Sequence, residues 1–260
     1  MKYQALIVLT GCLLIGVITC SRKTVPAYEI SKFSKEQALP NREGNQISLN
    51  ISYPQFQSTD PFWDQVNLTI LKAVNKDMLD QSMHSDFEAF WNHFVSEFSK
   101  ESEDFPEGLF GWALDRSVEV LYLSNRLLSL RFTEYQYTGG AHPNTTTHFL
   151  NYDVKNEKPL SLENLFLKNS GDELKALAET EFRKAKGIPE DASLNEQGYF
   201  FENDHFRLST EFAIEKSGVL FYYNQYDIAP YAAGPAELLL TYEALKPIID
   251  SKGALRSMVK

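Results

Sequence analysis

The chain has 260 residues, of which 43% are hydrophobic and 13% aromatic, so it can build a packed core and is not an intrinsically disordered chain. Its formal net charge is −10, so it lacks the excess of Lys and Arg that non-specific nucleic-acid binding requires. An acidic surface keeps a protein soluble and attracts basic partners by electrostatic steering.

The N-terminus has the pattern of a bacterial lipoprotein signal peptide, over residues 1–19. Lys2 precedes an apolar run of about 15 residues, Ala5 to Thr19, which is short for a membrane-spanning helix. The chain's two cysteines, Cys12 and Cys20, both lie near this run. Cys20 is the expected lipidation site because polar residues follow it at once. Cys12 is the alternative, and an unlipidated membrane anchor is a third possibility.

Residues 20–45 are polar and include Pro26, Pro40 and Gly44, which predicts a lipid-anchored tether between the membrane and the folded part. Lipidation of Cys20 would leave no cysteine pair for a disulfide. The hydrophobic core alone would then hold the exported domain.

Residues 46–140 are expected to form an N-terminal α+β domain. Alternation over Ile47–Tyr53 predicts a strand that Pro54 ends, and Asp60-Pro61 starts a helix with apolar residues at every fourth position to Met78. An aromatic stripe predicts a second helix over 86–99, whose side chains pack in the core. Strands around 118–122 and 128–132 then form a hairpin with its turn at Ser124-Asn125.

Residues 141–260 are expected to form a C-terminal α+β domain. A strand over 145–154 precedes a helix that a Ser170/Glu173 capping box starts and Gly187 ends. Strands follow at 211–215, 219–223 and 236–241, with a last helix over 242–251. The predicted fold class is therefore α+β, with antiparallel sheets, packed helices and two small α+β subdomains.

No standard catalytic motif for a serine hydrolase, a zinc protease or a nucleotide-binding enzyme is present. His142 and His148 lie six residues apart, but no clear third ligand accompanies them. Glu134 and Asp227 are candidate carboxylates, although a glycosidase pair needs a fixed separation that the sequence does not reveal. We therefore predict no catalytic residue, no metal site and no cofactor.

Two stretches have an unusual composition. Tyr135–Asn144 contains two consecutive glycines that allow a sharp bend, and Phe221–Pro235 combines tyrosines with two prolines and a glycine. They are either structural corners that dock on one another or an exposed recognition surface rich in tyrosine. The turn residues are Gly139, Gly140, Pro143, Pro230 and Gly234, and the candidate ligand-binding residues are Tyr137, His142, Asn144, Tyr223, Tyr226, Asp227 and Tyr231.

The motifs YTGGAHPN (137–144), LSLENLF (160–166) and YDIAPYAAG (226–234) resemble an extracytoplasmic domain pair. It is shared by the peptidoglycan deacetylase PdaC and the lysozyme-sensing anti-sigma factor RsiV, and the resemblance covers roughly residues 45–252. The deacetylase domain of such proteins would lie further along the chain, and its Asp/His/His metal set is not found here. The resemblance therefore implies the extracytoplasmic binding region of these proteins, and neither the whole deacetylase activity nor the whole anti-sigma activity.

These observations favour a non-enzymatic cell-envelope lipoprotein, lipid-anchored and facing the periplasm or the surface. It is expected to bind a protein or a peptidoglycan fragment, and no nucleic acid. Binding or inhibition of lysozyme is the first alternative, since a basic lysozyme suits an acidic chain. An unrecognised hydrolase or deacetylase of cell-wall glycans is the second.

Overall fold

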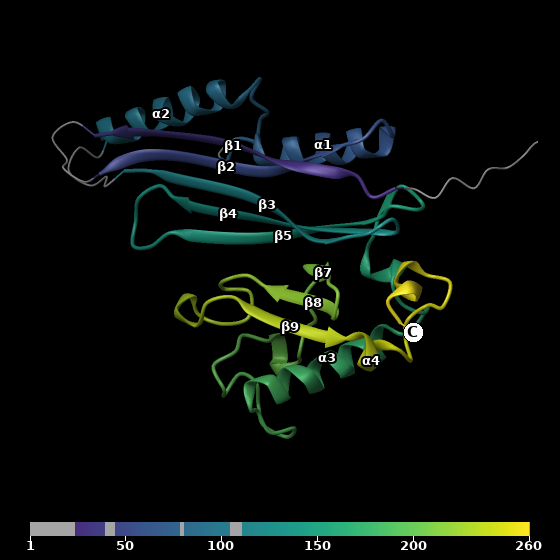
Figure 1. Ribbon diagram of the computed structural model, residues 1–260. Coiled ribbons are helices and arrows are strands. Elements are labelled where there is room, and N and C mark those ends of the chain that lie inside the picture. Colours follow the sequence, from purple (N-terminus) through teal and green to yellow (C-terminus); the bar gives the residue numbers. More distant parts are fainter. Residues whose placement is uncertain (1–23, 40–44, 79–80, 105–110, 260) are drawn as a thin grey trace, which may run out of the picture.

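The computed structural model describes residues 24–39, 45–78, 81–104 and 111–259. The described chain forms layers: two helices, a six-stranded sheet, a three-stranded sheet, and a further helix on the far side (Figure 1). The predicted signal peptide, Cys12 and Cys20 lie outside the described residues. Within the described ranges, no helix is long and apolar enough to cross a membrane.

The large sheet has the order β1-β2-β3-β4-β5-β6, and every neighbouring pair is antiparallel except β2 and β3, which run parallel. A parallel pair needs a long crossover, which here contains both helices of the first layer. The strands are β1 (Ala27–Ala38), β2 (Gln46–Gln57), β3 (Ala113–Leu123), β4 (Leu127–Tyr137), β5 (Asn144–Asp153) and β6 (Lys158–Pro159).

Strand β1 corrects the expectation of a tether over residues 20–45. Ala27–Ala38 pairs along its whole length with β2, and Phe33 reaches Phe87 of the second helix, with ring centroids 5.5 Å apart. An edge strand needs only the backbone of one neighbour, so its exposed and charged sequence gave no clear periodic signal. Strand β2 also continues through Pro54, where β3 no longer pairs with it and a missing N–H is tolerated.

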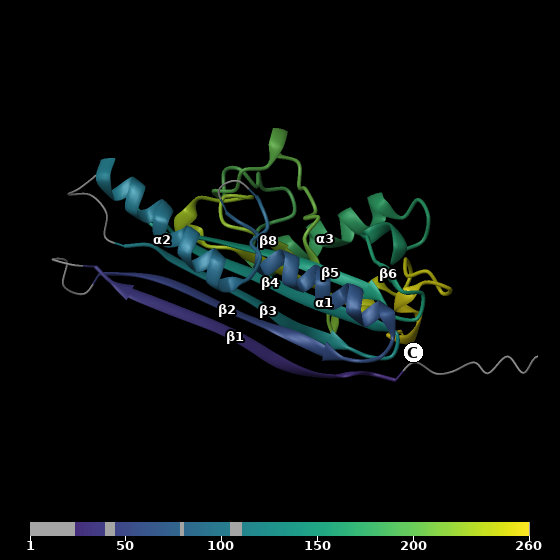
Figure 2. The same ribbon diagram turned by 90° about the horizontal axis from the view of Figure 1, so that it is seen from above.

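Helices α1 (Pro61–Val74) and α2 (Phe87–Asp104) cover one face of the large sheet (Figure 2). Asp60 caps α1 by accepting a hydrogen bond from the Phe62 amide at 3.0 Å, and Pro61 takes the first position, as predicted. The helix ends at Val74, before Met78, because buried Arg116 donates to the carbonyls of Val74 and Lys76 there.

The C-terminal part contains the three-stranded antiparallel sheet β7-β8-β9 and its helices. Gly187 ends the long helix with a φ of 67°, as predicted, but Ser170 makes no capping bond and donates instead to the Leu167 carbonyl. The elements are α3 (Gly171–Lys186), β7 (Phe212–Ile214), β8 (Gly218–Tyr223), β9 (Ala236–Thr241), α4 (Tyr242–Leu245) and the short 3-10 turns Leu162–Asn164, Glu202–Asp204, Tyr231–Ala233 and Ala254–Ser257.

The apolar residues form two cores, which agrees with the predicted α+β class and two subdomains. One core lies between α1, α2 and the large sheet, and the other surrounds α3 and the small sheet. The large sheet continues to Pro159, so the predicted boundary between residues 140 and 141 falls between β4 and β5 of one sheet. The last strand of the large sheet is β6, so the boundary between the N-terminal and C-terminal parts lies after β6.

Candidate functional site

The two unusual stretches meet in the structure. His142, in the loop between β4 and β5, stacks on Tyr231 of the loop between β8 and β9, with ring centroids 3.7 Å apart and planes 19° apart. Tyr226 lies beside both rings, with its centroid 6.3 Å from His142 and 5.7 Å from Tyr231. We name these three residues the His142 cluster.

Hydrogen bonds fix the orientation of the rings in the His142 cluster. The hydroxyl of Tyr231 donates to the Pro143 carbonyl at 3.0 Å, and Nδ1 of His142 lies 3.0 Å from the same oxygen. A carbonyl only accepts, so this contact assigns the proton to Nδ1. Nε2 of the same ring lies 3.2 Å from the Tyr226 hydroxyl. The imidazole is therefore held between the Pro143 carbonyl and the Tyr226 hydroxyl.

Tyr226 combines an uncommon backbone conformation with exposure. Its φ is 68°, a left-handed region that a bulky L-residue rarely adopts, and 55% of its surface is exposed. The Asp227 side chain accepts from the Asn224 amide at 2.8 Å, and the Asp227 amide donates to the Asn224 carbonyl at 3.1 Å. These bonds close the turn that carries Tyr226. A backbone in this conformation persists only where the surrounding structure holds it, and such strained residues cluster at functional sites.

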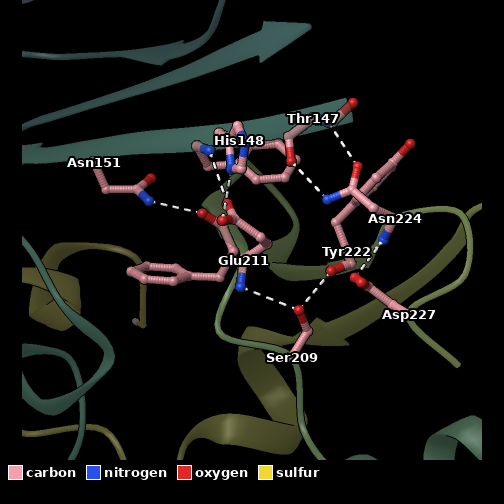
Figure 3. A network of polar contacts seen from close by, with 10 residues as sticks. Thr147, His148, Asn151, Ser209, Glu211, Tyr222, Asn224 and Asp227 are labelled. Atoms are coloured by element: carbon pink, nitrogen blue, oxygen red, sulfur yellow. Dashed lines mark hydrogen bonds and ion pairs between the residues drawn. The ribbon is translucent and has the colours of Figure 1, made fainter. Parts of the chain in front are cut away.

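Asn224 anchors that turn to the large sheet. Its side-chain carboxamide makes two hydrogen bonds with the backbone of Thr147 in β5. The Thr147 N–H donates to Oδ1 at 2.6 Å, and Nδ2 donates to the Thr147 carbonyl at 3.0 Å (Figure 3). The side chain thus satisfies the backbone groups of Thr147 as a neighbouring strand would. The position of the His142 cluster therefore depends on contact between the two sheets.

Glu211 extends this polar network along β5 (Figure 3). Its carboxylate accepts from the Phe149 amide at 3.1 Å and contacts Nδ1 of His148 at 2.9 Å. The hydrogen bond to Glu211 raises the pKa of His148 above its usual value, against the opposing effect of burial. Ser209 holds the adjacent backbone by accepting from the Glu211 amide and donating to the Tyr222 carbonyl. His148 thus serves the interface between the sheets, whereas His142 lies in the aromatic cluster.

The remaining predicted residues divide into turn, surface and core. Gly139, Gly140 and Gly234 have φ values of 99°, 98° and 71°, and Tyr137 donates to the Gly140 carbonyl at 3.2 Å. Pro143 supplies the carbonyl of the cluster, and Pro230 precedes the short turn that carries Tyr231. Asn144 is exposed at the start of β5.

The position of Tyr223 does not fit its prediction as a ligand-binding residue. It is fully buried in the core around α3, and its hydroxyl donates to the Arg207 carbonyl at 2.9 Å. Burial raises its pKa, so the hydroxyl stays protonated. Both faces of β8 are buried, and alternation along the strand turns Tyr223 toward Phe182 of α3 and Tyr222 toward Phe149 of β5.

Sequence reasoning missed the residues that join the sheets, namely Asn151, Asn224 and Glu211. Asn151 and Glu211 are single polar residues in or beside a strand with no motif around them, and Asn224 lies in the Phe221–Pro235 stretch but outside its YDIAPYAAG motif. Their role depends on which backbone groups of another sheet lie opposite, and only the folded structure sets that. In the described ranges, no group of three or more His, Cys, Asp or Glu side chains could hold a metal ion.

Comparison with known proteins relates both parts of the chain to described families. A model described as deacetylase PdaC matches residues 41–145, and a model of a protein family of unknown function, DUF3298, matches residues 163–243. The peptidoglycan-N-acetylmuramic acid deacetylase PdaC of Bacillus subtilis is 25% identical over 69% of this chain, but only 39% of that relative's length is covered. The immunogenic protein MPT64 of Mycobacterium tuberculosis is 28% identical over 44% of this chain and 49% of its own length.

Two solved structures share the fold over nearly the whole described chain. A DUF3298 family member from Bacteroides fragilis has a TM-score of 0.73 at 24% identity, covering 91% of this chain and 99% of that one. A DUF3298 family protein from Pseudomonas aeruginosa has a TM-score of 0.65 at 20% identity, covering 88% and 96%. The chain therefore carries a PdaC-like domain pair, with a PdaC domain followed by a DUF3298 domain.

Proposed function

We propose that this protein is a non-enzymatic binding module of the bacterial cell envelope and that its His142 cluster recognises a protein partner. The observation that carries the proposal is the exposed Tyr226, whose backbone has a φ of 68° in a turn closed by its own loop and whose hydroxyl contacts His142 of a distant loop. Exposed tyrosines in rigid settings contribute large contact areas at low entropic cost, so they frequently dominate binding energy.

The charge of the molecule favours a basic partner. The net charge is −10, and the carboxylate of exposed Asp227 lies next in sequence to Tyr226. Opposite charges accelerate association and are screened by salt. Lysozyme, a basic protein that attacks the cell wall, is the partner we propose to test first.

We further propose that the chain faces outward from the cytoplasm, attached through a lipid on Cys20, or less favourably on Cys12. Support comes from the sequence pattern before Cys20 and from the PdaC relative, whose name places its action on peptidoglycan. Replacement of Cys20 by Ala, with mass spectrometry of the N-terminal peptide, tests this. Absence of a lipid from both Cys20 and Cys12 in the wild type would refute it.

The experiment for the partner is a binding titration of the purified protein with hen egg-white lysozyme at low and moderate salt. We expect a complex that weakens with salt and loses at least about tenfold in affinity in Tyr226→Ala. Tyr28→Ala on β1, another partly exposed tyrosine (40%), is the matched control and should bind normally. No complex at low salt would refute this partner, and normal binding by Tyr226→Ala would refute the cluster as the contact surface.

Action on cell-wall glycans, as hydrolase or deacetylase, is the remaining alternative. The name of the PdaC relative favours it, although the chain spans only 39% of that relative. Prolonged incubation with peptidoglycan, followed by assays for acetate and for new reducing ends, tests both reactions. Release of either product would favour this alternative over a purely binding role.

A further inference from the structure

A groove of about 320 Å³ lies on the face of the large sheet turned away from α1 and α2. Ile47, Leu49 and Ile51 of β2 pack in the core beneath the helices, so the alternating residues of this strand point to the opposite face. The small sheet packs against β3, β4 and β5 through β7, and Figure 2 shows β1 at the opposite edge of the large sheet. The residues that line the groove come from β1 to β4.

Strand register aligns polar side chains across the groove in two rows. One row runs Ser34, Asn50, Asp115 and Tyr135 from β1 to β4, and the next runs Lys32, Ser52, Ser117 and Thr133. The Ser34 hydroxyl donates to the side-chain Oδ1 of Asn50 at 2.5 Å, and Nδ2 of Asn50 donates to Oδ1 of Asp115 at 2.7 Å. Ser34, Asn50 and Asp115 of the first row are therefore pre-oriented by their own hydrogen bonds.

The second row and the aromatic residue have spare hydrogen-bonding capacity. In the described part of the chain, no side-chain hydrogen bond joins the hydroxyls of Ser52, Ser117, Thr133 or Tyr135 to another residue. Within the two rows the charges are balanced, because Lys32 and Asp115 are their ionised side chains. Glu36, Glu119 and Arg131 lie further along the same face. Arg116, whose backbone lines the groove, turns its side chain to Glu134 and to α1 on the helix side.

We propose that this groove binds an uncharged oligosaccharide. Rows of hydroxyl, amide and carboxylate groups match the many hydroxyls of a sugar, which donate and accept at once, and the Tyr135 ring offers a flat surface to a pyranose face. Balanced charge gives no preference for a phosphate or another anion. The volume lies at the lower end of the range of about 300–1,000 Å³ for small-molecule sites.

This site is separate from the His142 cluster, and its failure would leave the proposed protein partner untouched. The test is a titration of the purified protein with chitotetraose, followed by calorimetry and by NMR shifts of backbone amides. We expect saturable binding with a Kd of roughly 0.1–1 mM, as suits an open groove. The shifted amides should belong to β1–β4.

Variants then locate the site. Asn50→Ala and Tyr135→Ala should each weaken binding at least about tenfold, because the first removes a pre-oriented amide group and the second removes the aromatic ring. Ser31→Ala is the matched control, since its hydroxyl donates to Gln55 on the same pair of strands and does not line the groove. Circular dichroism checks that each variant is folded. Absence of binding at millimolar chitotetraose, or binding that folded groove variants leave unchanged, would overturn the proposal.

Discussion

The two faces of the large sheet are stabilised by different physical means. The face under α1 and α2 packs in an apolar core that includes Trp63, Ile70 and Leu114, whose side chains are almost completely buried. The face toward the small sheet is joined by buried polar groups, among them Asn151 and Ser129. Apolar packing is non-directional and tolerates changes of shape, whereas a buried hydrogen-bond network fixes one arrangement and tolerates few changes.

Asn151 shows how directional the polar face is. Its Oδ1 accepts from the Ser129 hydroxyl at 2.7 Å and from the Ile214 amide at 3.2 Å, and its Nδ2 donates to the Phe212 carbonyl at 2.7 Å. Asn224 from the other layer makes the reciprocal contact with Thr147. Each sheet thus uses one asparagine to bind the backbone of the other, which fixes the position of the His142 cluster.

The largest effect is expected on the apolar face. Trp63→Ala should lower the free energy of unfolding by about 3–5 kcal/mol, because it leaves a cavity where Phe56 and Phe62 now contact the indole. Ile70→Val, which nearly preserves shape, should cost only about 0.5–1.5 kcal/mol. Chemical denaturation measures both, and a similar cost for the two variants would contradict a tightly packed face.

A substitution on the polar face is expected to cost less stability than Trp63→Ala and to disturb the arrangement of the two sheets more. Asn151→Leu has a similar size but removes the hydrogen-bond partner of the Ser129 hydroxyl and of the Phe212 carbonyl, and leaves the Ile214 amide with Ser129 only, at a cost of about 2–4 kcal/mol. The same variant should weaken binding at the His142 cluster, because the layer that carries Tyr226 is no longer fixed. Asn144→Ala, exposed on the same strand, is the control and should stay within about 0.5 kcal/mol. Wild-type stability in Asn151→Leu would show that apolar contacts alone join the layers.

The smallest effect is a pH dependence at His148. Glu211 raises the pKa of this imidazole in the folded state, so its protonated form stabilises the fold. That contribution is fully present below the unfolded pKa of about 6.5 and is lost as the pH rises through the raised folded value. The Tm difference between wild type and His148→Gln should therefore shrink from pH 5 to pH 8, by a few degrees at most for an exposed pair. A difference that does not change with pH would show that the pair contributes nothing.

Local signals in the sequence determined most of the elements. The caps at Asp60 and Gly187, the alternation along β2 and the apolar spacing of α1 depend only on neighbours in the chain, so the existence and type of these elements were predicted correctly. The ends at Pro54 and Met78 were not, because β2 continues to Gln57 and α1 ends at Val74. The motifs around His142 and Tyr231 also identified the two loops that meet. Local chemistry determines such features because caps, turns and periodicity act within a few residues.

Tertiary structure alone decided the edge strand β1, the parallel pairing of β2 with β3 and the burial of Tyr223. It also decided the alignment of Asn50 with Asp115 and the hydrogen bonds that Asn151 and Asn224 make with the backbone of the opposite sheet. These features depend on the register between strands far apart in the chain, and a shift of one residue would turn every side chain to the other face. The sequence by itself thus determined the elements and their caps, while long-range pairing determined which polar residues share a surface.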